Sequence, residues 1–95
     1  MHIEGKAALI TGAAAGIGRA IAVALAEKGV RHLTLCDIDD KGLAETAVLA
    51  ERHGAAVTAR RLNVADFQDC RRALEEADHD EGLDIVINNA GIVAA

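Results

Sequence analysis

Short apolar runs alternate with stretches of helical periodicity along the whole of this 95-residue chain. The predicted strands cover residues 7–11, 33–36, 56–63 and 83–88. The first predicted helix covers residues 17–28, and the second begins at Asp39 or Asp40 and ends at Gly54. The third predicted helix follows a capping residue at Asp66. This alternation implies parallel pairing, because each helix must cross back over the sheet. Right-handed crossovers then predict a doubly wound α/β sheet with the strand order 3-2-1-4.

Apolar residues recur along one side of each predicted helix. The expected inward faces contain Ile17, Ile21, Ala24 and Leu25 in the first helix, Leu43, Ala47 and Ala50 in the second, and Phe67, Cys70, Leu74 and Ala77 in the third. The strand over residues 56–63 is less apolar than the others, so we expect it nearer an edge of the sheet. The chain has one aromatic residue, which predicts a modest core.

A glycine-rich run follows the first predicted strand and opens the first predicted helix. It reads Thr11-Gly12-Ala13-Ala14-Ala15-Gly16-Ile17-Gly18. One glycine permits a tight turn, another lets the backbone approach a phosphate, and a third lets helix and strand pack closely. The start of the helix presents unpaired N–H groups and a positive dipole end, which suit a pyrophosphate. A glycine-rich turn without a ligand is the alternative.

Asp37 ends the second predicted strand, about 20 residues after the glycine run. A carboxylate at this place can accept hydrogen bonds from both ribose hydroxyls of an adenosine and would repel a 2′-phosphate. Ala15 and Ile38 add no basic side chain nearby, and the nearest cation, Arg19, could equally be a solvated surface residue. We therefore predict NAD rather than NADP, with a turn residue before a helix as the alternative for Asp37.

Three motifs together resemble the short-chain dehydrogenase/reductase superfamily over essentially the whole chain. They are Thr11-Gly12-x-x-x-Gly16-Ile17-Gly18, Asn63-Val64 and Asn88-Asn89-Ala90-Gly91. The pattern is most similar to the branch that includes 3-oxoacyl carrier-protein reductases and polyol dehydrogenases. The resemblance implies a Rossmann-type fold that binds a dinucleotide in the crevice between the first and fourth strands.

The resemblance also implies a role for each matching residue. Asn63 and Val64 would flank the adenine, residues 89–91 would line its ribose side, and Asn88 would tie the central strands. A strand-ending turn is the alternative, because asparagine and glycine suit such turns in any protein. The predicted cofactor-binding residues are Gly12, Ala14, Ala15, Gly16, Ile17, Gly18, Asp37, Ile38, Asn63, Val64, Asn89, Ala90 and Gly91.

Catalysis in this superfamily depends on a Tyr-x-x-x-Lys pair, in which the tyrosine is the acid/base. The chain contains no tyrosine, and neither Lys28 nor Lys41 lies in a comparable place. We therefore expect residues 1–95 to be a single partial dinucleotide-binding domain of an oxidoreductase, truncated after the fourth strand, with no catalytic residue and no hydride transfer of its own. The alternatives are a stand-alone nucleotide-binding or self-associating module, or an inactive fragment. The open edge of the fourth strand would suit a second copy or a complementary chain.

Composition and charge argue against several other functions. A net charge of −5 and a pI near 5.2 disfavour nucleic acid, which needs a basic surface. No apolar run is long enough to span a membrane.

The four histidines lack metal-binding spacing, so we predict no metal site and expect each histidine at the surface or at a helix end. Cys36 and Cys70 show no pairing pattern, which favours a reducing cytoplasm, and Cys36 is expected to be a buried strand residue.

Overall fold

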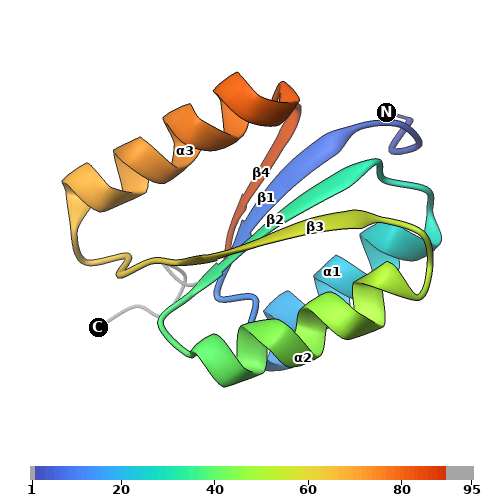
Figure 1. The fold of residues 1–95 in the computed structure, drawn as a ribbon, viewed down its shortest axis with the longest axis horizontal. Coiled ribbons are helices and arrows are strands. Elements are labelled where there is room, and N and C mark those ends of the chain that lie inside the picture. The colour runs from blue at the N-terminus through green and yellow to red at the C-terminus, as the bar shows by residue number, and fades with distance from the viewer. Residues whose placement is uncertain (1, 90–95) are drawn as a thin grey trace.

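The computed structural model describes residues 2–89, and its four strands form one parallel sheet in the order β3-β2-β1-β4 (Figure 1). The elements are β1 (Ala7–Thr11), α1 (Gly16–Glu27), β2 (His32–Asp37), α2 (Asp40–Glu51), β3 (Ala56–Arg61), α3 (Phe67–Glu81) and β4 (Ile85–Asn88). Helices α1 and α2 cover one face of the sheet and α3 covers the other (Figure 1). The predicted Rossmann-type doubly wound fold and its strand order are confirmed, as is the edge position of β3.

The strand register brings the carboxyl ends of the strands side by side. Thr11, at the end of β1, lies beside Cys36 of β2 and Asn88 of β4. Asp37 pairs with Arg61 at the end of β3. The loops that leave the strands therefore share one edge of the sheet, and the connections change direction at β1. Open α/β sheets bind ligands at such an edge.

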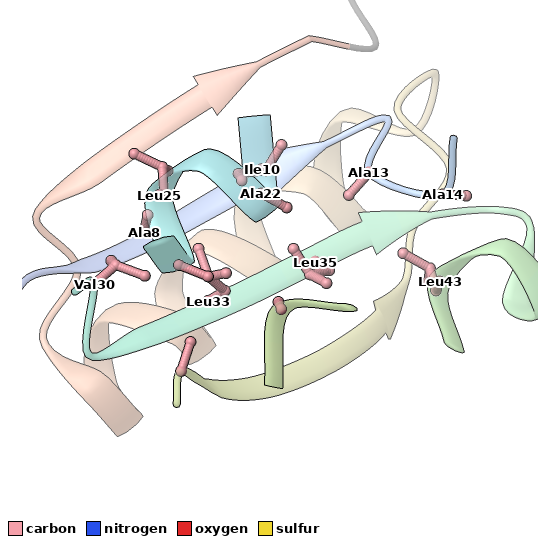
Figure 2. Packing of buried hydrophobic residues seen from close by; sticks show 13 residues of the cluster. Ala8, Ile10, Ala13, Ala14, Ala22, Leu25, Val30, Leu33, Leu35 and Leu43 are labelled. Atoms are coloured by element: carbon pink, nitrogen blue, oxygen red, sulfur yellow. The ribbon is translucent and has the colours of Figure 1, made fainter. Parts of the chain in front are cut away.

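The larger core lies between the sheet and helices α1 and α2 (Figure 2). Alternate residues of β1 and β2 point to this side, and Ile10, Leu33 and Leu35 are fully buried there. The same cluster includes Ala8, Ala13, Ala14, Ala22, Leu25, Ala26, Val30, Leu43, Ala50 and Ala55. Because alanine dominates the helix side, leucine and isoleucine side chains of the strands supply much of the apolar volume.

The inward face of α1 agrees with the predicted one at Ile21 and Leu25, which contribute to the larger core, and differs at two other residues. Ile17 is 71% exposed, and Ala24 is also exposed. The buried residues of the helix are Gly18, Ala22, Leu25 and Ala26. Small residues let α1 approach the sheet closely, but they contribute little to an apolar pattern. The prediction was therefore wrong at Ile17 and Ala24, and it missed the buried small residues Gly18, Ala22 and Ala26.

The smaller core lies between the sheet and α3. It contains Leu9, Cys36 and Leu62 from the sheet side and Ala73 and Ala77 from the helix. The predicted face of α3 was wrong at its first residue, since Phe67 is 78% exposed, and Leu74 is also exposed. Phe67 begins the helix, whereas the buried alanines lie in its middle and later turns, so only this part of α3 packs tightly against the sheet.

Two titratable side chains of β2 are buried on the α3 side of the sheet. His32 is only 5% exposed, so the expected surface position was wrong. The residue is buried because β2 begins one residue earlier than predicted and includes it. Its Nε2 lies 2.9 Å from Thr58 Oγ1, and burial lowers the pKa of the imidazole. Cys36 is fully buried as expected, and burial raises the pKa of its thiol to about 12.

The helices within residues 2–89 do not have the length and apolar character that a membrane span requires. The longest, α3, has 15 residues and carries charged side chains along most of its length.

Candidate functional site

A pocket of about 220 Å³ opens at the carboxyl edge of the sheet. Six residues from the ends of β1, β2 and β3 line it: Gly12, Asp37, Ile38, Leu62, Asn63 and Val64. Five of them are predicted site residues, so the fold brings together positions that are far apart in the sequence. Leu62 was missed, because its apolar side chain fits a strand equally well and nothing local distinguishes it.

Hydrogen bonds from nearby backbone N–H groups fix the orientation of the Asp37 carboxylate. Its Oδ2 accepts a hydrogen bond from the N–H of Ala14 at 3.0 Å, and its Oδ1 accepts one from the N–H of Asp39 at 3.1 Å. An ionised carboxylate offers about four lone pairs, so each oxygen can accept a further bond. Asp37 is also the only charged side chain among the six lining residues. The pocket can therefore bind a pair of neighbouring hydroxyl groups through one fixed carboxylate.

The glycine run has the geometry that its composition predicts. Gly12 and Gly16 adopt positive φ angles of 65° and 57°, which favour glycine. Gly18 is needed for a different reason, since a Cβ there would lie 2.0 Å from the Gly12 carbonyl oxygen and 2.9 Å from Asn89 Nδ2. Any side chain at position 18 would separate α1 from the turn that precedes it.

The N-terminus of α1 is unlike those of the other helices. Asp39 caps α2 by accepting from the N–H of Gly42, and Asp66 caps α3 by accepting from the N–H of Asp69. The N-cap of α1 is Ala15, which provides no side-chain acceptor, and no acidic residue occupies the first turn. The first N–H groups of a helix have no intrahelical partner, so this end of α1 can accept an anion.

Ala14 occupies a different environment from its neighbours in the glycine run. It is buried, and its N–H donates to Asp37 while its carbonyl accepts from Arg19 Nη2 at 2.6 Å. Ala15, Gly16 and Ile17, in contrast, are exposed. The peptide groups open to a ligand thus begin after Ala14, at the start of α1.

Polar side chains connect β4 to the glycine run. Thr11 Oγ1 donates to Asn88 Oδ1 at 2.9 Å, which provides the tie between central strands that the resemblance implied. Asn89 Nδ2 donates to the Gly12 carbonyl at 3.2 Å. The last two predicted site residues, Ala90 and Gly91, lie outside the described residues.

The loop after β3 is shaped by Asn63. Its side-chain Oδ1 accepts from the N–H of Ala65 at 3.0 Å, and its carbonyl accepts from the N–H of Asp66 at 2.9 Å. Such a local bond from an asparagine oxygen stabilises a turn. Val64 follows in this turn and is 40% exposed, so its apolar side chain is available to a flat ligand in the pocket.

Residues 6–95 match the family described as short chain dehydrogenase. SadH of Mycobacterium tuberculosis is 47% identical over 93 residues, which cover 94% of this chain and 32% of that protein. Human 15-hydroxyprostaglandin dehydrogenase (NAD⁺) is 43% identical over 95 residues, which cover 97% of this chain and 35% of that enzyme. The crystal structure of a short-chain dehydrogenase/reductase from Burkholderia phymatum in complex with NAD has 32% identity and a TM-score of 0.82, covering 90% of this chain and 31% of that one.

The chain spans about a third of the length of the relatives that it matches. The match includes the glycine run, the strand-end acid and the asparagines that follow β3 and β4. Proteins of this family are oxidoreductases that use NAD(H) or NADP(H). Fold, strand order and sequence agree: the chain belongs to the short-chain dehydrogenase/reductase family.

Proposed function

We propose that this chain binds NAD as the dinucleotide-binding part of an NAD-dependent oxidoreductase. The observation that carries the proposal is the Asp37 carboxylate, which two backbone N–H groups hold in the pocket. Asp37 is the only charged residue among the six that line the pocket, so the 2′-phosphate of NADP would be repelled by its carboxylate. A relative named with NAD⁺ and a relative crystallised with NAD support the same preference.

The residues present fit the parts of such a cofactor. Asp37 would accept bonds from the adenosine ribose hydroxyls, and the exposed side chains of Ile38 and Val64 would contact the adenine. The uncapped first turn of α1, which begins at Gly16, would hold the pyrophosphate through its N–H groups. When bound, the cofactor supplies a nicotinamide that accepts or donates a hydride.

A dehydrogenase also needs a group that exchanges a proton with the substrate oxygen. The chain contains no tyrosine, and Asp37, the one ionisable residue lining the pocket, is assigned to the ribose. We therefore infer that these 95 residues bind the cofactor but transfer no hydride by themselves.

The substitution Asp37→Asn tests the proposal, because it removes the charge and keeps one side-chain oxygen. We expect the unaltered chain to bind NADH more tightly than NADPH, and the variant to reduce that preference by roughly tenfold, about 1.4 kcal/mol. Binding can be followed by NADH fluorescence, since the chain has no tryptophan or tyrosine. Asp40→Asn is the matched control, because Asp40 is exposed, pairs with Arg61 and does not line the pocket. An unchanged preference in the Asp37 variant would contradict the assignment.

A second candidate function is a module that self-associates or accepts a complementary chain along β4. Within residues 2–89 this strand is at the edge of the sheet, and its Val86 side chain is 53% exposed. An unpaired strand edge is able to pair with another chain. The native mass distinguishes the two cases, since a dimer of one species supports self-association and a second polypeptide supports a complementary chain.

We also propose a reducing cytoplasmic location. Both cysteines are free thiols, with Cys36 buried in β2 and Cys70 partly buried in α3. Disulfides are rare in such a compartment.

A further inference from the structure

Arg19 reaches from the first turn of α1 to both the glycine run and α2. Its Nη2 donates to the Ala14 carbonyl at 2.6 Å and to the Gly42 carbonyl at 3.3 Å. Its Nε donates to Thr46 Oγ1 at 2.9 Å, and Nη2 also pairs with Glu45 Oε1 at 3.1 Å. The guanidinium is therefore held by four partners and is not the solvated surface group that the sequence left open.

Thr46 extends this connection into the interior. Its side chain is fully buried, and its Oγ1 donates to the Ala13 carbonyl at 2.8 Å. The N–H of Ala13 in turn donates to the Cys36 carbonyl at 3.1 Å. Arg19 and Thr46 together, here named the loop clasp, thus bond the carbonyls of two consecutive residues in the glycine run.

Gly42 allows α2 to come close enough for the loop clasp to form. A Cβ on this residue would lie 2.7 Å from both the Cβ and the carbonyl oxygen of Ala14. The first turn of α2 therefore lies directly against the glycine run. Sequence patterns did not identify Gly42 or Thr46, because their partners are about 30 residues away and belong to another element.

We propose that Arg19 is a positioning residue for dinucleotide binding. Through the loop clasp it fixes the peptide groups of Ala13 and Ala14, and with them the turn that leads into the uncapped N-terminus of α1. This inference rests on the proposed function, since the fixed turn is the one that would hold the pyrophosphate. Because Glu45 and three oxygen acceptors engage Arg19, it acts through the loop and does not bind a 2′-phosphate.

The planar guanidinium is needed for this arrangement. Arginine presents five N–H donors in a rigid fork, whereas lysine presents a compact ammonium at the end of a flexible chain. Lysine at position 19 would keep the charge beside Glu45 but would not bond Thr46 and the Ala14 carbonyl together. The change Arg19→Lys therefore separates the hydrogen-bonding role from the charge.

The experiment compares the unaltered chain with Arg19→Lys, Thr46→Val and a control, Arg71→Lys. Arg71 is a matched control because it forms an exposed ion pair with Glu75 on α3, on the other face of the sheet. Three quantities are measured: the affinities for NADH and NADPH, the affinity for adenosine, which lacks the pyrophosphate, and the amide exchange rates of the cofactor-free chain.

We expect both clasp variants to weaken NADH and NADPH binding by a similar factor, about tenfold. Adenosine binding should weaken less than NADH binding, because adenosine lacks the pyrophosphate and Asp37 keeps its hydrogen bond from the N–H of Asp39 even where the Ala14 peptide is loosened. Amides of Ala13 and Ala14 should exchange faster, while those of β1 and of the control variant should not change.

Other results would overturn the inference in different ways. A loss confined to NADPH would mean that Arg19 contacts the 2′-phosphate. A loss of adenosine affinity equal to the loss of NADH affinity would mean that Arg19 and Thr46 have a general structural role. Unchanged amide exchange together with unchanged affinities would mean that the loop clasp does not position the glycine run. If the unaltered chain fails to bind NADH, the proposed function is contradicted, whereas failure of the clasp alone leaves NADH binding intact.

Discussion

His32 is a neutral histidine buried at the start of β2, and this environment makes folding depend on pH. Burial lowers its pKa below the ordinary 6.5, and its Nδ1 has no hydrogen-bond partner within residues 2–89. At a pH below 6.5 the unfolded chain therefore binds a proton that the folded chain lacks. Stability contributed by neutral His32 is complete above pH 6.5 and is lost as the pH falls through the lowered pKa.

We expect the free energy of unfolding to decrease between pH 7.5 and pH 5, as measured by urea titration at each pH. The substitution His32→Gln should flatten this dependence, because glutamine does not titrate. His53→Gln is the control, since His53 is an exposed residue beyond the end of α2. Equal slopes for the unaltered chain and the His32 variant would contradict the assignment.

At the scale of elements, the stability of α3 depends more on its end caps than the stability of α1 and α2 does. Small side chains, Ala73 and Ala77, provide its buried contacts. Arg60 of β3 adds ion pairs to Asp69 at 3.1 Å and to Glu76 at 2.8 Å. Partly exposed ion pairs of this kind contribute little to stability. The intrinsic stability of the helix, including its cap, is therefore more important for α3.

The cap of α3 offers a direct test of this view. Asp66→Ala removes the acceptor for the N–H of Asp69 and should destabilise the chain by about 1 kcal/mol. Gln68→Ala is the control, because Gln68 is exposed in the same turn and caps nothing in the described structure. Urea titration followed by circular dichroism measures both, and equal effects would argue against a specific role for the cap.

At the scale of the whole molecule, the two faces of the sheet differ in how much apolar side chain they bury. The α1 and α2 side contains Ile10, Leu33, Leu35 and Leu43, whereas the α3 side relies on two leucines and small residues. Folding should therefore depend mainly on the first core. We expect the sheet to tolerate the loss of contacts on its second face better than on its first.

Leu35→Ala should destabilise the chain by about 2–5 kcal/mol, because Leu35 is fully buried between the sheet and the paired helices. That is a large share of the roughly 5–15 kcal/mol typical of a folded domain. Leu74→Ala on α3 should cost less than about 1 kcal/mol, since Leu74 is 37% exposed. Urea titration of both variants checks the difference, and a reversed order would contradict the difference in burial between the two leucines.

The strand order and the position of Asp37 could be predicted, because they follow from local properties. Apolar runs, helix-length intervals and crossover handedness determine the order β3-β2-β1-β4. Gly12 and Gly16 were identifiable because a positive φ favours glycine. Asp37 ends a strand, and strand ends meet at one edge of a parallel sheet, so its place beside the glycine run required no further information.

Only the tertiary structure decided that Ile17 and Phe67 are exposed and that His32 is buried. It also decided that Arg19 bonds the glycine run to α2. These features depend on what lies across from each residue. Glycine and alanine allow close approach without adding to an apolar pattern, so Gly18, Gly42 and Ala73 could not mark the contacts they permit. A sequence determines its periodicity and backbone preferences directly, whereas a contact between distant residues exists only once the folded chain has brought them together.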